Sequence, residues 1–308
     1  MSVIHVQAPG LFTTVQDLGR EGYGPMGVSA SGAADPVSLR IGNRLVGNAD
    51  GAAALEMTLL GGSFLFPQGA VIALTGSDFG ATMDRTTVEC WKPVQITPGQ
   101  TLSLGQTRSG ARCYLCVRGG IEVRPFLGSA STHILSGLGG LDGRSLRKGD
   151  VLNIGPVSGT FRHAAITTRA LEHLFPRKIL RVTPGPQCDW FPESSQALFY
   201  SSTYRVSEES NRMGLRLVGD TVPVLSGGGE MTTEGVSLGA IQIPEGGQPI
   251  VLFVEQQTTG GYPKIANVIS ADLASVGQLR PRDEIRFEKV SWEMARSLLR
   301  EMEELISE

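Results

Sequence analysis

Short runs of β-forming residues bounded by glycine or proline recur along this chain and limit the folds open to it. Glycine accounts for 40 of the 308 residues, against a usual share of ~7%. Glycine permits the tight turns and bulges that divide a chain into short strands. Such runs occupy 70–76, 110–121, 178–185, 235–244 and 249–255. We therefore predict a fold that is mainly β with a few helices.

Two segments have helical periodicity instead. In the segment 35–48, DPVSLRIGNRLVGN, Asp35 is a typical N-cap, Pro36 suits the first turn, and Gly47 lies where a C-terminal cap belongs. From about Ser291 to the end, apolar residues recur at spacings of three and four, and acidic residues fill the opposite face. The second pattern predicts an amphipathic helix at the end of the sequence, which either packs on its own domain, the expected arrangement, or makes a subunit contact.

The length and two internal echoes predict two domains. A chain of 308 residues is comfortable for two domains at ~100–200 residues each. The segment at 42–48 echoes 214–220, and LRKGDVLNIG at 146–155 echoes LRPRDEIRF at 279–287. We therefore expect related halves at 1–175 and 176–308. A cleft between such domains is a favoured place for a small-molecule site.

Composition and charge exclude several classes of partner. The net charge is −3 and no basic cluster is present, so the sequence lacks the electrostatic footprint of a protein that binds nucleic acid or an acidic membrane. No apolar run is long enough to span a bilayer. The first residues, MSVIHVQAPGLFTTVQDLGR, have no signal or transit pattern, and we expect a cytoplasmic protein.

A C-x-x-C motif at Cys113 and Cys116 raises the question of a zinc or redox site. Both cysteines lie in a β-type run, where residues three apart point to opposite faces of the sheet. A zinc knuckle needs a tight turn and a second pair of ligands, and the sequence has no second Cys or His pair at ligand spacing. We predict that the chain binds no metal.

Two familiar catalytic signatures are also weak or missing. No G-x-x-x-x-G-K-[ST] motif is present, so a phosphate-cradling P-loop is not available for ATP. The segment GVSLG around Ser237 fits G-x-S-x-G. A nucleophile elbow requires a helix after the serine, whereas the residues that follow predict a strand and a turn.

Four segments place hydrogen-bonding side chains beside glycines, at 13–35, 210–217, 231–236 and 256–264. Any one of them fits an ordinary turn. Together they favour a shared polar cleft that orients a small polar ligand. The predicted substrate-binding residues are Asp17, Arg20, Ser31, Asp35, Gln187, Asn211, Arg212, Gln257, Thr258 and Tyr262.

The predicted catalytic residues are Glu234, Asp189 and Lys264. Lys264 and Arg212 would neutralise a substrate carboxylate. Gln257 and Thr258 would hold an amide, with Gln187 and Gln242 as further amide-orienting groups. The residues leave two chemistries open. Phosphoryl transfer would need cations such as Arg20, Arg40, Arg212 and Lys264. Proton abstraction from an amide would need a base such as Glu56, Asp189 or Glu234.

Several long motifs together resemble one known family. They are GLFTTVQDLGREGYGPMGVSASGAADPVSLRIGNRLVGN, GARCYLCVRGGI, VTPGPQCDWF, SNRMGLRL and TTGGYPKIA, and they span almost the whole chain. They are similar to the biotin-dependent carboxyltransferase related family, also called allophanate hydrolase subunit 2 related or KipA-type, many of whose members are 5-oxoprolinase C subunits. The resemblance implies a fold of two cyclophilin-like β-barrel domains.

The resemblance also implies partners and an activity. A KipI-type protein, which is the B subunit of 5-oxoprolinase, would join a further A subunit to complete the ATP-dependent opening of 5-oxo-L-proline to L-glutamate. ATP would be used by the complex, with no cofactor bound tightly by this chain alone. A related domain in urea carboxylase moves a carboxyl group from carboxybiotin to urea, which makes biotin the cofactor of an alternative interpretation. A third interpretation is a non-catalytic regulator that binds a KipI-type protein.

Overall fold

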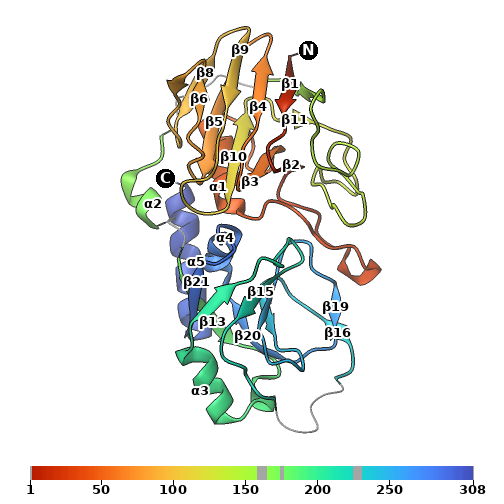
Figure 1. Cartoon of the computed structure of the whole chain (residues 1–308), viewed down its shortest axis with the longest axis vertical. Helices are drawn as coiled ribbons and strands as arrows, with labels where there is room; N and C mark the ends of the chain where they lie inside the picture. The colour runs from red at the N-terminus through yellow and green to blue at the C-terminus, as the bar shows by residue number, and fades with distance from the viewer. Residues whose placement is uncertain (1, 158–164, 174–176, 225–230, 308) are drawn as a thin grey trace. The chain divides into compact units, whose positions relative to one another are not determined.

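The computed structural model describes residues 2–157, 165–173, 177–224 and 231–307. The chain forms two compact units (Figure 1). The N-terminal unit comprises Met1–Arg20 and Ser31–Leu174, and the C-terminal unit comprises Glu21–Ala30 and Phe175–Ser307. The predicted joint near residue 175 lies outside the described residues. The segment 21–30 groups with the C-terminal unit, which a single boundary in the sequence does not anticipate.

The N-terminal unit is built from two antiparallel sheets. One has the strand order β11-β12-β1-β4-β9-β6-β7, and the other has the order β2-β3-β10-β5-β8. Its strands are β1 (Val3–Ala8), β2 (Phe12–Gln16), β3 (Ala54–Thr58), β4 (Ser63–Phe66), β5 (Ala70–Gly76), β6 (Thr82–Met83), β7 (Thr86–Thr87), β8 (Pro93–Ile96), β9 (Gln100–Ser103), β10 (Arg112–Val117), β11 (Ile121–Glu122) and β12 (Val151–Ile154). Its helices are α1 (Pro36–Leu45) and α2 (Thr168–His173).

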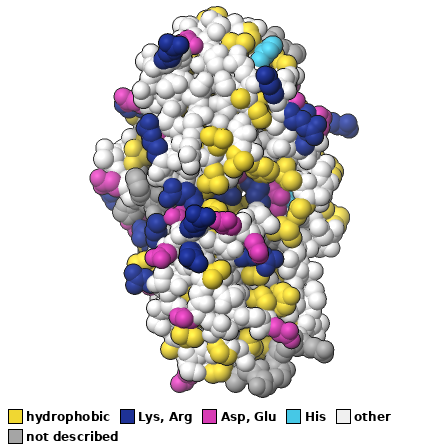
Figure 2. All heavy atoms as spheres, viewed as in Figure 1, with side chains coloured by type: hydrophobic (Ala, Val, Ile, Leu, Met, Phe, Trp, Pro, Cys, Tyr) yellow, Lys and Arg dark blue, Asp and Glu magenta, His cyan; other side chains and the backbone are white. Residues whose placement is uncertain are grey.

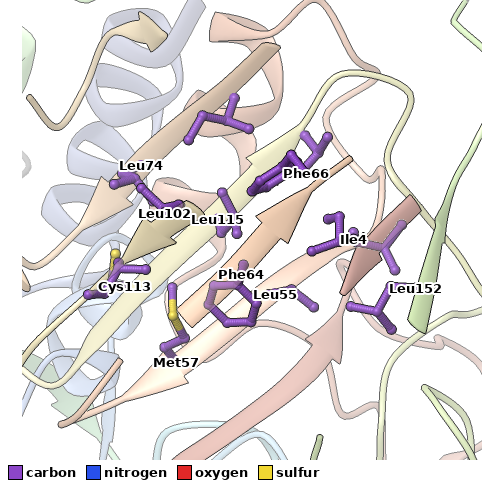
Figure 3. Close-up of a cluster of buried hydrophobic side chains, with 14 of the residues drawn as sticks. Ile4, Leu55, Met57, Phe64, Phe66, Leu74, Leu102, Cys113, Leu115 and Leu152 are labelled. Atoms are coloured by element: carbon purple, nitrogen blue, oxygen red, sulfur yellow. The ribbon is translucent and has the colours of Figure 1, made fainter. Parts of the chain in front are cut away.

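The core of this unit contains inward-facing side chains from both sheets. Figure 3 shows Phe64 and Phe66 of β4 beside Leu55 and Met57 of β3, with Leu115 of β10 next to them. All five side chains are fully buried. β10 lies between β3 and β5 and is buried at every position, as expected of a central strand covered on both faces.

The two cysteines of the C-x-x-C motif do lie on opposite faces of β10. Cys113 packs in the core with Met57 (Figure 3). Cys116 faces α1, where a Cβ added to Gly42 would lie 2.6 Å from its sulfur. Burial raises the pKa of both thiols. Such cysteines behave as small apolar side chains.

The helix predicted at 35–48 is confirmed as α1. Asp35 is the N-cap, and its carboxylate accepts hydrogen bonds from the backbone N–H and the hydroxyl of Ser38, at 2.9 and 2.6 Å. Pro36 is the first helical residue. Gly47 follows the helix with a φ of 75°, a left-handed conformation that glycine adopts without strain.

The C-terminal unit contains a closed barrel with the strand order β13-β20-β17-β18-β15-β14-β21. β13 and β21 pair in parallel, and the other barrel pairs are antiparallel. The barrel strands are β13 (Ile179–Pro184), β14 (Tyr204–Val206), β15 (Gly214–Val218), β17 (Ala240–Gln242), β18 (Ile250–Leu252), β20 (Lys264–Val268) and β21 (Glu284–Lys289).

A separate two-stranded ribbon accompanies the barrel. It consists of β16 (Glu234–Gly235) and β19 (Thr259–Gly260), which pair with each other (Figure 1). The helices of this unit are α3 (Glu193–Ser201), α4 (Leu273–Gly277) and α5 (Trp292–Ser307), with short 3-10 turns η1 (Gly24–Met26), η2 (Cys188–Trp190) and η3 (Ser270–Asp272). The prediction of a mainly β chain with a few helices is confirmed, and so is the C-terminal helix α5.

One of the two internal echoes is wrong as a structural correspondence. The segment 42–48 contains the end of α1 and its cap, whereas 214–220 contains the strand β15. Residues of the pattern G-x-R-L-V-G therefore adopt helix in one place and strand in the other. The Asp35 cap and Pro36 start the helix, while pairing with β14 and β18 holds the strand.

The second echo is confirmed in atomic detail. The Asp150 carboxylate accepts a hydrogen bond from the backbone N–H of Arg147 at 2.7 Å. The Asp283 carboxylate accepts the same bond from the N–H of Arg280 at 2.9 Å. Each aspartate N–H also donates back to the carbonyl of the same arginine. One turn therefore occurs twice, before β12 and before β21.

Among the described helices, none combines the length and the apolar character needed to cross a bilayer. Lys and Arg side chains are interspersed with Asp and Glu on the face that Figure 2 shows. This mixture agrees with the small net charge of −3. On that face, the mixture of charges does not create the one-signed field that steers a polyanion.

Candidate functional site

Asp17 and Arg20, both predicted to bind substrate, hold a loop of the N-terminal unit in place. Asp17 accepts hydrogen bonds from the hydroxyls of Ser129 and Ser131, at 2.6 and 2.5 Å, and from the N–H of Ala130 at 2.6 Å. Arg20 donates to the carbonyl of Ser131 and lies over the ring of Phe126. The sequence did not single out the two serines, because nothing in S-x-S marks a partner more than a hundred residues away.

Glu56, a candidate base, lies in a buried network of the same unit. Its carboxylate accepts hydrogen bonds from the Tyr114 hydroxyl at 2.7 Å and from the N–H of Ala34 at 2.8 Å. The guanidinium of Arg112 lies 3.5 Å away. Burial, with the nearby Glu56 charge, raises the pKa of Tyr114. These contacts fix the segment before α1, and they leave Glu56 poorly placed to take a proton from a ligand.

Ser31 and Asp35 complete the predicted residues of this unit. Ser31 is buried with a φ of 55°, and its hydroxyl has no hydrogen-bond partner among the described residues. Asp35 caps α1 through Ser38. The capping contacts give Asp35 a structural task, whereas the Ser31 hydroxyl has none in the described structure.

The C-terminal unit brings several predicted residues into one polar cluster. We call Gln187, Glu234, Gln242, Gln257, Gly260 and Lys264 the Lys264 cluster. Lys264 is the first residue of β20 and is 2% exposed. Its Nζ lies 2.5 Å from Oε1 of Glu234 and 3.9 Å from the sulfur of Met231. A buried ammonium is costly without an anionic partner, and Glu234 supplies that partner.

Gln187 connects the two charged residues. Its Nε2 donates to Oε1 of Glu234 at 2.9 Å, and its Oε1 accepts the backbone N–H of Lys264 at 3.2 Å. The hydrogen bonds from Lys264 and then Gln187 hold the pKa of Glu234 below its ordinary value of 4.5. A lowered pKa makes Glu234 a weaker base, which disfavours the predicted role in proton abstraction.

Gln242 brings an unused donor to the cluster. It lies opposite Lys264 in the β17–β20 pairing and is 1% exposed. Its Nε2 has no hydrogen-bond partner among the described residues. A Cβ added to Gly260 would lie 2.5 Å from this nitrogen and 3.1 Å from Nε2 of Gln257. Glycine at 260 therefore allows two side-chain amides to approach the ribbon closely.

Arg212 is a buried cation that already has a partner. Its Nε lies 2.5 Å from Oε1 of Glu255, and the two side chains are 8% and 2% exposed. The backbone N–H of Glu255 also donates to the carbonyl of Arg212 at 2.8 Å. Arg212 was predicted to neutralise a substrate carboxylate. In the structure the carboxylate of Glu255 occupies that position beside the guanidinium. This pair ties the chain before β15 to the turn after β18.

The remaining predicted residues lie at the periphery. Asn211 accepts the N–H of Met213 at 2.8 Å, which is the local bond of an Asx turn. The carbonyl of Thr258 accepts the N–H of Val236 at 3.1 Å. Tyr262 is 46% exposed. Asp189 is exposed in η2, two residues from Gln187.

Two further expectations can be compared with the structure. Ser237 donates to Asn267 at 2.7 Å and is followed by the strand β17, so the strand predicted after G-x-S-x-G is confirmed and the helix of a nucleophile elbow does not follow. Within the described part of the chain, no group of three or more His, Cys, Asp or Glu residues could hold a metal ion.

Comparison with known proteins agrees with this architecture. The family described as "Carboxyltransferase domain, subdomain A and B" matches residues 26–289. The C subunit of the Escherichia coli 5-oxoprolinase is 40% identical over 286 residues, which cover 93% of this chain and 91% of that protein. The urea amidolyase of Saccharomyces cerevisiae is 38% identical over 314 residues, which cover 96% of this chain and 17% of that protein. The crystal structure of the K. lactis urea amidolyase matches 99% of this chain and 20% of its own, with a TM-score of 0.92 and 35% identity.

Proposed function

The chain belongs to the carboxyltransferase domain family, subdomains A and B, and from this premise we propose that it is the C subunit of a multi-subunit, ATP-dependent 5-oxoprolinase. The reaction hydrolyses the lactam of 5-oxo-L-proline to L-glutamate while ATP is converted to ADP and phosphate. The 5-oxoprolinase relative from Escherichia coli supports the proposal, because the similarity covers nearly all of both proteins.

The observation that carries the proposal is the composition of the Lys264 cluster. A buried ammonium lies beside side-chain amides that can donate and accept hydrogen bonds. The substrate 5-oxoproline carries a carboxylate and a lactam amide on one small ring, and these two groups need the same two kinds of partner. Urea offers an amide without a carboxylate, so it uses the amide half of this cluster alone.

In this proposal the residues of the cluster bind and orient the substrate. Lys264 faces the carboxylate, and Gln187, Gln242 and Gln257 hold the amide, with Thr258 and Tyr262 of the same segment at the edge. Asp189 remains the candidate base, since it is exposed two residues from Gln187 in the sequence, whereas Glu234 is held in an ion pair. ATP would be bound in the assembled complex with a KipI-type B subunit, together with a further A subunit.

A second candidate function is carboxyl transfer from carboxybiotin to urea or a related amide. The similarity to urea amidolyases over almost the whole chain favours it. The unpartnered donor of Gln242 also suits the carbonyl oxygen of urea. The regulatory interpretation, in which the chain binds a KipI-type protein without catalysis, predicts that neither reaction of the experiment below depends on this chain.

We predict that the purified chain alone does not turn over 5-oxoproline, because the sequence has no recognisable ATP site and the Escherichia coli relative is named as a subunit. Glutamate and ADP should form together once both partner proteins are added. Glutamate and ADP are measured with 5-oxoproline, and in a parallel arm carboxylated urea is measured with urea and carboxybiotin. Rapid glutamate formation by the single chain would contradict the prediction, and carboxylation of urea without glutamate formation would favour the second function.

A further inference from the structure

The Lys264 cluster closes on itself through neighbouring contacts. Lys264 and Gln242 are cross-strand partners in the barrel, so their side chains lie on the same face. Gln242 adjoins Gly260 of the ribbon. Gly260 is in turn the strand-pairing partner of Glu234, and the carboxylate of Glu234 forms an ion pair with Lys264. A buried cation, a buried amide donor and a carboxylate from the ribbon are therefore linked by neighbouring contacts.

The two members of the ion pair differ sharply in exposure. The side chain of Lys264 is 3% exposed, whereas that of Glu234 is 44% exposed. Lys264 lies in the barrel wall at the start of β20. Its buried charge requires a counter-ion even when the Glu234 side chain moves away. Glu234 belongs to a two-residue strand outside the barrel and can be solvated by water when it leaves. Of the pair, Glu234 is thus the member that can be replaced.

The hydrogen bonds made by Glu234 leave part of the cluster unused. Its Oε1 accepts from both Lys264 and Gln187, while the Nε2 of Gln242 has no partner among the described residues. A buried donor without a partner is unfavourable. A ligand with a carboxylate and a second acceptor could bond Lys264 and Gln187 and also satisfy Gln242. Glu234 satisfies two of the three groups.

We propose that the Lys264 cluster is a carboxylate-binding site whose resting occupant is Glu234, and that a ligand carboxylate binds by displacing this side chain from Lys264 and Gln187. The class of ligand is a small carboxylic acid with an adjacent amide or carbonyl acceptor. Its identification as 5-oxoproline rests on the proposed function. Glu234 is then an internal competitor that shields the buried ammonium until the ligand arrives.

The Arg212–Glu255 pair does not have this property. Both of its side chains are almost fully buried, at 8% and 2% exposure, so neither can reach water without displacing the residues that cover it. The structural contrast separates a fixed ion pair from an exchangeable one within the same unit.

The test is a binding measurement on the full chain by calorimetry, with three probes. The probes are 5-oxoproline, acetate as a plain carboxylate, and 2-pyrrolidinone, which has the lactam without the carboxylate. Glu234→Gln keeps the side-chain size and removes the competing charge. We expect it to tighten the binding of 5-oxoproline and acetate about tenfold, equivalent to about 1.4 kcal/mol, and to leave 2-pyrrolidinone unchanged. Lys264→Met should abolish the binding of acetate.

Glu208→Gln is the matched control, because Glu208 is also in an ion pair, with Arg282, but is 66% exposed and outside the cluster. It should bind all three probes as the unmodified chain does. Unchanged or weaker binding of both carboxylates to the folded Glu234→Gln variant would overturn the proposal, as would a complete lack of acetate and 5-oxoproline binding. Tighter acetate binding without glutamate formation in the complex would retain this site and refute the 5-oxoprolinase assignment.

Discussion

Gly260 and Gly261 are adjacent glycines with different surroundings, and the difference allows a test of the site at the scale of one methyl group. A Cβ at Gly260 would lie 2.5 Å from Nε2 of Gln242, whereas the nearest atoms to a Cβ at Gly261 are 3.5 Å away. A contact at 2.5 Å forces the amide to move, and one at 3.5 Å is ordinary packing.

We therefore predict that Gly260→Ala weakens 5-oxoproline binding at least fivefold, while Gly261→Ala changes it less than twofold. Both variants should keep the fold, with unfolding free energies within about 1 kcal/mol of the parent, because the atom that must move at Gly260 ends a side chain. Calorimetry and thermal unfolding give the two readouts. Equal binding by the two variants would mean that Gln242 does not contact the ligand.

The Arg212–Glu255 pair makes a second prediction at this scale. Glu255→Ala would leave the guanidinium of Arg212 buried without its carboxylate. We expect a loss of about 3–5 kcal/mol in the free energy of unfolding. Glu208→Ala removes the partner of Arg282, where both side chains are mostly exposed, and should cost less than about 1 kcal/mol. Denaturant titration of both variants checks this, and similar losses would refute a structural role for the buried pair.

At the scale of elements, the sequence predicted those whose signals are local. Asp35, Pro36 and Gly47 mark α1 within a few residues of chain, and the glycine-bounded run at 70–76 coincides with β5. The run at 249–255 was too long, since β18 ends at Leu252 and Glu255 lies in a turn. An apolar run does not reveal where a strand loses its pairing partner.

The same limit applies to the site and to the echoes. The sequence named Gln187, Glu234 and Lys264 as candidate site residues, and the structure brings these three side chains together. The partners of Asp17 and Arg212 lie far away in the sequence. The structural contacts that these two residues make could therefore not be predicted from local pattern. The echo at 42–48 failed because tertiary pairing, not local pattern, makes 214–220 a strand.

The cap of α1 gives a prediction for this scale. Asp35→Ala removes the acceptor for the N–H of Ser38 and should lower the free energy of unfolding by about 1 kcal/mol, within a usual range of about 0.5–2. Asp35→Asn keeps a capping oxygen and should recover most of that loss. Thermal unfolding of the two variants is the measurement. If Asn were as destabilising as Ala, the capping oxygen would not account for the contribution of Asp35.

At the scale of the whole molecule, the two units share one structural feature, the turn that contains Asp150 in one unit and Asp283 in the other. In the N-terminal unit Val6 of β1 donates its N–H to the carbonyl of Asp150 at 2.9 Å, and in the C-terminal unit Val206 of β14 donates to Asp283 at 2.9 Å. Each aspartate thus joins its turn to a neighbouring strand. The repeated turn supports the expectation of related halves more firmly than the sequence echo does, because side-chain and backbone bonds recur together.

The side-chain carboxyl groups of Asp150 and Asp283 both have a lowered pKa, but the interactions that lower it differ. For Asp150 the hydrogen bonds from Arg144 are the largest cause. For Asp283 burial raises the pKa, but the N–H of Arg280 and the ammonium of Lys178 together outweigh it. A folded-state pKa below the ordinary value of 3.8 means that the ionised form stabilises the fold. This stabilisation is present above that value and is lost as the pH falls through the folded-state pKa.

We therefore predict that Asp150→Asn and Asp283→Asn each destabilise one unit at neutral pH and reduce its sensitivity to acid below about pH 4. Hydrogen exchange resolved by peptide should rise in β1 and β12 for Asp150→Asn, and in β14 and β21 for Asp283→Asn, since those strands are joined to the respective turns. Asp142→Asn is the control, because Asp142 is 74% exposed and should leave exchange unchanged. If either turn variant loosened the strands of the other unit to the same degree, the two units would unfold as one cooperative structure, and the repeated turn would not be a local lock for each.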